Sequence, residues 1–211
     1  MRVLLIVPPY ALEEHPTPPL SLSYLASNLP SHDIEVEILD LLTSKPSVSK
    51  IQRKLEQYKP QIVGITSVTM NFTPAAKILK VCKDHDPDVK AIIGGPHVSF
   101  TVKDTFHRAP WIDVIVKGEG DSTILELLLA LNASTDLTKV PGIAFTQDNH
   151  IIETEGRSLI KKLNGLPLPA RNLLPLSRYK ALGSSCSIIS SRGCPFSCIF
   201  CSAPKMFGRK V

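Results

Sequence analysis

Short apolar runs alternate with helix-like segments through the first 130 residues, and this alternation constrains the fold more than any other feature of the chain. Strand-like runs lie at 2–7, 34–39, 61–66, 90–95 and 113–120, and segments with apolar residues at helical spacing lie at 19–29, 48–58, 74–85 and 122–133. Continuous apolar strands are typical of a parallel sheet that is buried on both faces. The pattern therefore predicts a flavodoxin-like, doubly wound α/β domain over residues 1–135.

A different pattern begins after this domain. Residues 142–146 and 150–154 read as two strands of a small hairpin around Asp148 and Asn149. Prolines at 167, 169 and 175 then mark an extended linker, so residues 136–183 are expected to form a hairpin and a linker. Residues 185–191 are predicted to form one more strand, which opens a third region at 184–211.

Small residues follow the predicted strands at the edge where open parallel sheets bind ligands. Glycine allows a ligand to approach the backbone, and serine or threonine can donate a hydrogen bond to it. Any one of these glycines also suits an ordinary turn, but several strand ends of this kind together favour a flat, sizeable ligand. The candidate binding residues are Pro8, Pro9, Thr66, Ser67, Gly94, Gly95, Pro96, His97, Gly118, Glu119 and Gly120.

His97 has two readings, as a contact to a cofactor or as a structural residue of its turn. The stretch "GEGDST" lacks the third glycine of GxGxxG and follows the fifth strand, so a dinucleotide is not favoured. A P-loop is absent from the sequence.

Three cysteines, Cys194, Cys198 and Cys201, fall within eight residues in the spacing CxxxCxxC. Three soft thiolates suit three irons of a [4Fe–4S] cluster and leave the fourth iron open to an outside ligand. The alternatives are thiols that bind no metal and structural zinc, which requires four closed ligands. Cys186 lies close enough to be a fourth ligand, although a strand there would bury it, and Cys82 reads as a core residue of a helix.

Charge and the N-terminus exclude several other classes. The net charge is +5, but the basic residues are scattered, so a nucleic-acid partner is not expected. The first apolar run is too short for a signal peptide or a membrane span, which indicates a cytoplasmic protein without a membrane partner. In a reducing compartment, clustered cysteines more often bind metal than form disulfides.

The stretch "SRGCPFSCIFC" resembles the signature of radical S-adenosylmethionine (SAM) enzymes, including an aromatic residue, Phe200, directly before the last cysteine. Its Arg-Gly and Cys-Pro pairs are similar to those of the subgroup that carries an N-terminal cobalamin (B12)-binding domain. The motifs "PPLSLSYLASNL", "VGIT", "IIGGPHVS", "VKGEGD" and "LPLPARNLLPLSRY" follow in the order of that subgroup. The resemblance covers essentially all 211 residues.

The resemblance implies a [4Fe–4S] cluster on the three cysteines, SAM with Phe200 at its site, and a corrinoid against the strand ends. Thr66, Ser67 and Val68 take the place of the usual S-x-L motif, and Gly94 and Gly95 match the family's glycine pair. Many cobalamin domains carry a DxHxxG motif after the first strand, and its histidine is the lower ligand of cobalt. This sequence lacks the motif, and His15 in the corresponding loop lacks the flanking aspartate and glycine. We therefore expect cobalamin, if bound, to lack a histidine lower ligand.

The resemblance also implies a function for a longer protein. A partial radical SAM barrel needs on the order of 200 residues, so residues 184–211 match only its first strand and cluster loop. The expected parent is a methyltransferase or cyclase that cleaves SAM to start a radical reaction on an unknown substrate, with flavodoxin or ferredoxin as electron donor. This chain alone is expected to be inactive. The alternatives are a non-catalytic corrinoid- or tetrapyrrole-binding module and a zinc-stabilised structural domain.

Overall fold

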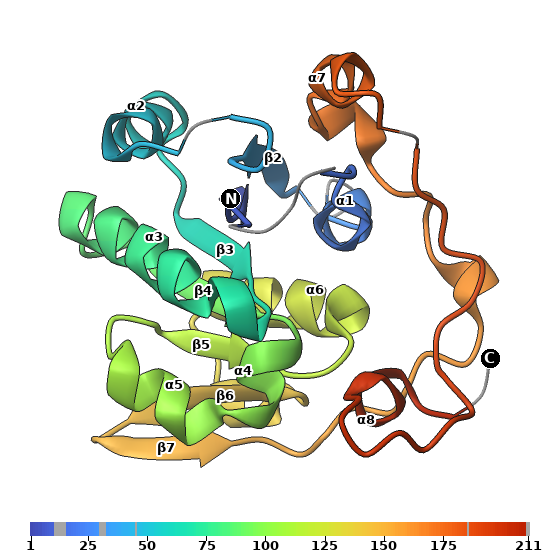
Figure 1. The fold of residues 1–211 in the computed structure, drawn as a ribbon. Coiled ribbons are helices and arrows are strands. Elements are labelled where there is room, and N and C mark those ends of the chain that lie inside the picture. Colours follow the sequence, from blue (N-terminus) through green and yellow to red (C-terminus); the bar gives the residue numbers. More distant parts are fainter. Residues whose placement is uncertain (11–15, 30–32, 45, 185, 210–211) are drawn as a thin grey trace.

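A single seven-stranded sheet, in the order β2-β1-β3-β4-β5-β6-β7, forms the centre of the protein (Figure 1). The computed structural model describes residues 1–10, 16–29, 33–44, 46–184 and 186–209. Strands β1 to β5 are parallel, and β6 and β7 continue the sheet antiparallel. The strands are β1 (Arg2–Val7), β2 (Glu35–Asp40), β3 (Ile62–Thr66), β4 (Lys90–Gly94), β5 (Val114–Val116), β6 (Ile143–Gln147) and β7 (His150–Glu153). The predicted doubly wound α/β fold is confirmed.

Helices cover both faces of this sheet (Figure 1). Helices α2, α3 and α5 pack on one face, and α1 and α6 pack on the other. The helices of this region are α1 (Leu20–Ser27), α2 (Val48–Tyr58), α3 (Phe72–His85), α4 (Pro96–Phe100), α5 (Val102–Arg108) and α6 (Gly120–Asn132), with 3-10 turns η2 (Thr69–Asn71) and η3 (Leu137–Lys139). Among the helices described, none has the length and apolar character needed to cross a membrane.

The burial of β1 shows why its sequence is continuously apolar. Leu4 and Ile6 belong to the core beneath α2 and α3, whereas Val3 and Leu5 belong to the core beneath α1 and α6. Successive side chains of a strand point to opposite faces, so a strand buried on both sides needs no polar positions.

The strand order reverses at β1, which lies between β2 and β3. Connections to the two neighbours leave β1 in opposite directions, and this switch point opens a crevice beyond the carboxyl ends of the strands. The topology therefore places a ligand site where β1 and β3 end.

The predicted hairpin is present, and it pairs directly with the parallel sheet. β6 lies antiparallel to β5, with Ile115 opposite Ala144. Asp148 and Asn149 have positive φ values of 50° and 61°, which suit the tight turn that joins β6 to β7. The hairpin thus extends the sheet of the α/β domain.

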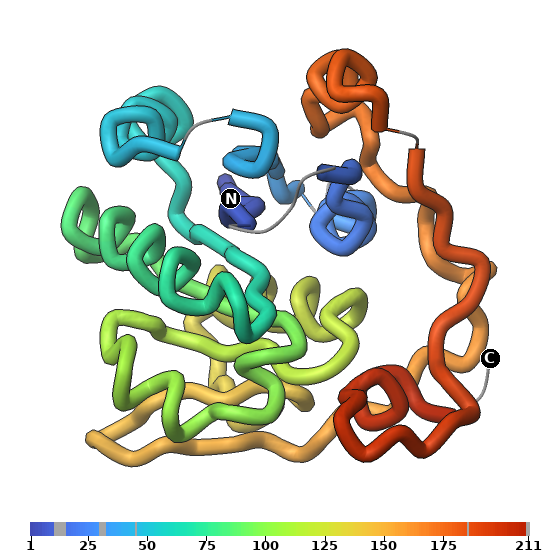
Figure 2. Tube along the Cα trace, in the orientation of Figure 1, coloured from blue at the N-terminus to red at the C-terminus, as the bar shows by residue number. Residues whose placement is uncertain are grey.

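Residues beyond β7 run along the side of the molecule where the parallel strands end (Figures 1 and 2). This segment contains η4 (Leu163–Gly165), η5 (Arg171–Leu173), α7 (Leu176–Ala181) and α8 (Ala203–Phe207). The Ala170 amide donates to the Ser23 carbonyl of α1 at 3.0 Å. In α7 the buried Tyr179 donates its hydroxyl proton to Asp40 at the end of β2. These contacts fasten the proline-rich linker to the first domain.

The strand predicted over 185–191 was wrong for the residues that the structure describes. Residues 186–191 have no strand assignment, and Ser185 lies outside the described residues. A strand requires a neighbour that accepts and donates its backbone hydrogen bonds. Within the described chain, no strand pairs with this segment, so its apolar sequence does not produce a ladder.

Candidate functional site

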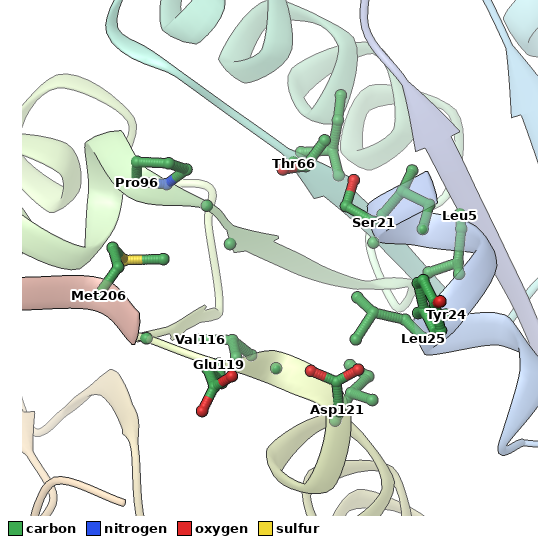
Figure 3. A pocket seen from close by; sticks show the side chains of 18 of the residues that line it. Leu5, Ser21, Tyr24, Leu25, Thr66, Pro96, Val116, Glu119, Asp121 and Met206 are labelled. Atoms are coloured by element: carbon green, nitrogen blue, oxygen red, sulfur yellow. The ribbon is translucent and has the colours of Figure 1, made fainter. Parts of the chain in front are cut away.

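An apolar pocket of about 200 Å³ lies at the carboxyl ends of the central strands, between α1 and α6 (Figure 3). Leu5, Gly64, Ile92 and Val116 line it from the sheet. Gly64 matters because a Cβ there would lie 2.9 Å from Cδ2 of Leu5. The pocket therefore depends on a glycine in the middle of β3, where no side chain stands up from the sheet.

The other walls come from two distant parts of the chain. Helix α1 contributes Ser21, Tyr24 and Leu25, and Met206 of α8 faces the pocket from the opposite side (Figure 3). Ile189, Arg192 and Phe207 also line it from the C-terminal segment. The segment that carries the cysteine motif therefore forms part of the same cavity as the sheet.

The structure brings together only part of the predicted set of binding residues. The predicted residues that line the pocket are Thr66, Gly94, Gly95, Pro96, Gly118, Glu119 and Gly120. The predicted residues outside its lining are Pro8, Pro9, Ser67, Val68, His97 and Phe200. The ends of β3, β4 and β5 thus converge as expected, whereas the two prolines after β1 stay apart.

The two adjacent glycines after β4 have different structural reasons. Gly95 has φ 102° and ψ 174°, a conformation that is essentially restricted to glycine. A Cβ on Gly95 would also lie 2.4 Å from the Ser67 carbonyl oxygen. At Gly94 a Cβ would meet its nearest atom, the Val116 carbonyl oxygen, at an ordinary 3.5 Å. Gly95 is therefore required by the backbone, and Gly94 keeps space open.

Ser67 and Val68 support the site from behind. Ser67 is buried, and its amide donates to the Gly94 carbonyl at 2.8 Å. The Val68 amide donates to Oδ1 of Asn71 at 2.8 Å. The first bond ties the end of β3 to the end of β4, and the second closes the turn after β3, so both residues shape the strand-end loop without lining the pocket.

The His97 side chain packs against η2 and α3. Its Nδ1 lies 3.2 Å from Oγ1 of Thr69, and its ring centroid lies 4.5 Å from that of Phe72. Burial, with help from the charge of Arg108, lowers the pKa of His97. His15, the other histidine considered, lies outside the described residues. The geometry of His97 favours its structural reading.

A buried ion-pair group closes one wall of the pocket. Arg192 donates through Nη1 and Nη2 to the two carboxylate oxygens of Asp121, at 2.7 and 3.1 Å, and through Nη1 to Glu119 at 3.1 Å. The side chains of Arg192, Glu119 and Asp121 are only 14%, 5% and 10% exposed. Burial would lower the pKa of Arg192, but hydrogen bonds and charge from the two carboxylates outweigh it and raise the pKa.

Sequence reasoning missed Arg192 and Asp121 as partners, although each lay inside a quoted motif. Their separation of 71 residues leaves no local signal that they meet. Tyr24 was also missed; the Arg192 guanidinium lies 5.6 Å from its ring centroid. An arginine two residues before a cysteine motif and an acidic pair after a strand were the available signals.

The three motif cysteines lie on one loop at the surface. Cys194 and Cys201 are partly exposed, and Cys198 is exposed. The Cys194 amide donates to the Gly208 carbonyl at 3.1 Å, which closes the loop onto the end of α8. Three accessible thiols within eight residues fit the donor chemistry of a soft metal centre. Across the described ranges, however, no group of three metal-binding side chains converges, so the ligands are not preassembled.

The other two cysteines divide clearly. Cys186 is exposed, so the expectation that a strand would bury it was wrong. Cys82 is fully buried in α3, as expected, and burial raises the pKa of its thiol to about 12.

This difference predicts selective alkylation at pH 8. Iodoacetamide should label Cys186, Cys194, Cys198 and Cys201 at least about a hundredfold faster than Cys82, because only the thiolate reacts and Cys82 is neither ionised nor accessible. Peptide mass spectrometry measures each rate, and the same reaction in concentrated urea is the control in which Cys82 should react. Equal rates for Cys82 and Cys186 in the folded chain would contradict the burial of α3.

Comparison with known proteins identifies the family of the α/β domain. The family described as "B12 binding domain" matches residues 13–128, more than half of the chain. The chain belongs to the B12-binding domain family. The pocket lining at the ends of β3, β4 and β5 lies within the matched B12-binding domain, and Arg192 and α8 approach it from outside the match.

The curated proteins similar to this chain include a methyltransferase and a cyclase. An uncharacterized methyltransferase of Pyrococcus horikoshii is 36% identical over 216 residues, which cover 100% of this chain and 47% of the relative. An anaerobic magnesium-protoporphyrin IX monomethyl ester cyclase of Rubrivivax gelatinosus is 32% identical over 219 residues, 98% of this chain and 39% of the relative. The chain thus spans less than half the length of these two relatives.

A solved structure shares the fold of the B12-binding domain and of the residues after it. The radical SAM methyltransferase TsrM of Kitasatospora setae, solved with cobalamin and a [4Fe–4S] cluster, superposes with a TM-score of 0.80 at 20% identity. The superposition covers 99% of this chain and 42% of TsrM. The resemblance to radical SAM proteins with a B12-binding domain is confirmed at the level of the family.

Proposed function

We propose that this chain is the corrinoid-holding part of a cobalamin-dependent radical SAM enzyme. The observation that carries the proposal is the apolar pocket at the strand ends, because its wall includes residues of the segment that carries the three cysteines. A cofactor bound there would contact the B12-binding domain and the cysteine segment at once. The single site thus joins the two chemistries that the sequence motifs suggest.

The size of the pocket limits how a corrinoid would bind. Pockets that enclose drug-sized ligands measure about 300–1,000 Å³, and this cavity measures about 200 Å³. It is too small for a whole tetrapyrrole but large enough for one ring-sized group attached to it. We infer that the macrocycle lies outside against Gly94, Gly95 and Gly118, and that an apolar group of its nucleotide tail enters the pocket.

The residues around the pocket would bind this group mainly by excluding water. Leu25, Ile92 and Val116 offer apolar contacts, and Met206 covers the side that faces α8. Thr66 places a hydroxyl at the rim. The sequence lacks DxHxxG, so the proposal keeps a corrinoid that would bind without a histidine lower ligand.

The proposed cluster ligands are Cys194, Cys198 and Cys201, with Phe200 beside the SAM site. Their thiols suit iron–sulfur chemistry, and the surface loop that carries them leaves room to converge on a metal. A [4Fe–4S] cluster bound there would supply the electron that cleaves SAM. In the full-length protein this would start a radical methylation or rearrangement, with flavodoxin or ferredoxin as donor in the cytoplasm.

Anaerobic reconstitution of the chain with iron and sulfide tests the metal assignment. We expect about four irons per chain, broad absorption at the short-wavelength end of the visible spectrum and an electron paramagnetic resonance signal after reduction. All three should be lost when Cys194, Cys198 and Cys201 are changed to alanine. The control replaces Cys186 with alanine and should retain the cluster. One zinc per chain and no cluster signal would overturn the iron–sulfur proposal in favour of a zinc-stabilised domain.

A further inference from the structure

Arg192 connects the segment that carries the cysteines to two carboxylates at the start of α6. We propose that Arg192 is a positioning residue that latches the cysteine loop onto the pocket, so that loop docking and ligand binding in the pocket strengthen each other. The latch itself is a property of the chain without cofactor. Only the coupling to a ligand rests on the proposed function.

Arg192 is held in one orientation by paired hydrogen bonds. Both of its terminal nitrogens donate to Asp121, one to each carboxylate oxygen, and this paired arrangement sets the orientation of the guanidinium as well as its distance. The three charged side chains are nearly buried. Buried charges are tolerated only when they are paired, so the loop cannot leave without exposing Asp121 and Glu119 to an unpaired state or to water.

The two carboxylates are directed to the C-terminal segment and away from their own helix. Glu119 is the N-cap residue of α6, yet its side chain makes no capping hydrogen bond. One of its oxygens accepts from Arg192 at 3.1 Å, and the other accepts from the Ile160 amide at 2.7 Å. Stabilising the helix terminus therefore does not account for the position of Glu119.

Arg192 lies at the junction of the pocket and the cysteine loop. It lines the cavity together with Ile189 and Met206 of the same segment. Cys194 follows two residues later, and its amide is bonded to Gly208, so residues 194–208 form one closed loop. Fixing Arg192 consequently fixes where this loop meets the strand ends.

Coupling follows because one cavity is shared by both parts. A ligand that touches Val116 on the sheet and Met206 on α8 binds more tightly to the docked state than to the undocked state. By thermodynamic reciprocity the docked loop raises the affinity for the ligand by the same factor. The pocket would therefore fill most readily when the cysteine loop is in place.

The first arm of the test uses the chain without cofactor. In Arg192→Met, we expect at least tenfold faster hydrogen exchange over residues 186–208 and at least tenfold faster alkylation of Cys194, with exchange in β1 to β5 unchanged. Arg192→Lys should fall between the two, because it keeps the charge and loses the paired donors. The control Arg209→Met removes an exposed arginine of the same segment and should behave as wild type.

Unchanged exchange and alkylation in Arg192→Met would overturn the latch. If that variant does not fold, Asp121→Asn provides the same test, because it removes the charge of the acceptor and keeps one oxygen. Wild-type behaviour of a folded Asp121→Asn chain would likewise overturn it.

The second arm adds methylcobalamin and is carried out in the dark. The methyl group of methylcobalamin occupies the upper position on cobalt, so exposed thiols bind the cobalt less readily. Wild type should bind methylcobalamin, and the alkylation rate of Cys194 should then fall at least fivefold. Arg192→Met should bind methylcobalamin about tenfold more weakly, and its Cys194 should be alkylated at the same rate with and without the corrinoid. Equal affinity of both chains would overturn the coupling while the latch stands. Failure of wild type to bind would instead overturn the proposed function, and the first arm would still decide the latch.

Discussion

Replacing Gly95 with alanine is expected to destabilise the α/β domain by about 3 kcal/mol or more. The backbone of Gly95 occupies a region that costs other residues about 1–3 kcal/mol. The new Cβ would also overlap the Ser67 carbonyl oxygen at 2.4 Å and the Ser67 amide nitrogen at 2.8 Å. Both are backbone atoms of a strand end, so neither can move without breaking the bond from Ser67 to Gly94.

Two other glycines separate the two causes. Gly118 has φ 69°, but a Cβ added there would meet no atom within 4 Å, so Gly118→Ala should cost only about 1 kcal/mol from the backbone conformation. Gly156 has neither feature, and Gly156→Ala should lie within about 0.5 kcal/mol of wild type. Urea unfolding followed by circular dichroism measures all three. A Gly95→Ala chain as stable as Gly156→Ala would show that the strand ends do not meet as described.

Replacing Gly94 with leucine is expected to leave the domain folded and to weaken corrinoid binding about a hundredfold, or about 2.7 kcal/mol. A Cβ at Gly94 makes only ordinary contacts, so the backbone accepts a side chain. Gly94 lines a cavity of about 200 Å³, and a leucine side chain there would take up space at the strand-end rim. Gly94→Ala, which adds a single carbon, should weaken binding much less.

The matched control makes the same chemical change away from the pocket. Gly165→Leu adds a leucine at an exposed residue where a Cβ meets no atom within 4 Å and which does not line the strand-end pocket. It should bind methylcobalamin as wild type does, measured by equilibrium dialysis. Tight binding by a folded Gly94→Leu chain would mean that the corrinoid does not use this pocket.

Local sequence pattern was sufficient for the α/β core. The runs that became β1 and α2 have complete periodic patterns, and both elements form where they were expected. Helices α4 and α5 were missed because five and seven residues are too few to show a helical period. The expected strand over 185–191 failed for a different reason, since a strand depends on a partner that local sequence does not specify.

The candidate site was predictable only where the topology of the sheet determines which residues meet. Parallel strands end on one edge, so Thr66, Gly94 and Gly118 were placed together by topology alone. Adjacency along the chain misled at Ser67 and His97, because Ser67 is bonded to the Gly94 carbonyl and the His97 ring packs against Thr69 and Phe72. The contact between Arg192 and Asp121 arises only when the C-terminal segment folds back over the strand ends.

Equilibrium dialysis of the chain against methylcobalamin in the dark is the decisive test of corrinoid binding at the strand ends, with Gly94→Leu and Gly165→Leu dialysed in parallel. We expect one corrinoid per wild-type chain, the same for Gly165→Leu, and about a hundredfold weaker binding for Gly94→Leu. No retained corrinoid on the folded wild-type chain, or equal retention by all three, would show that the pocket does not hold the cofactor.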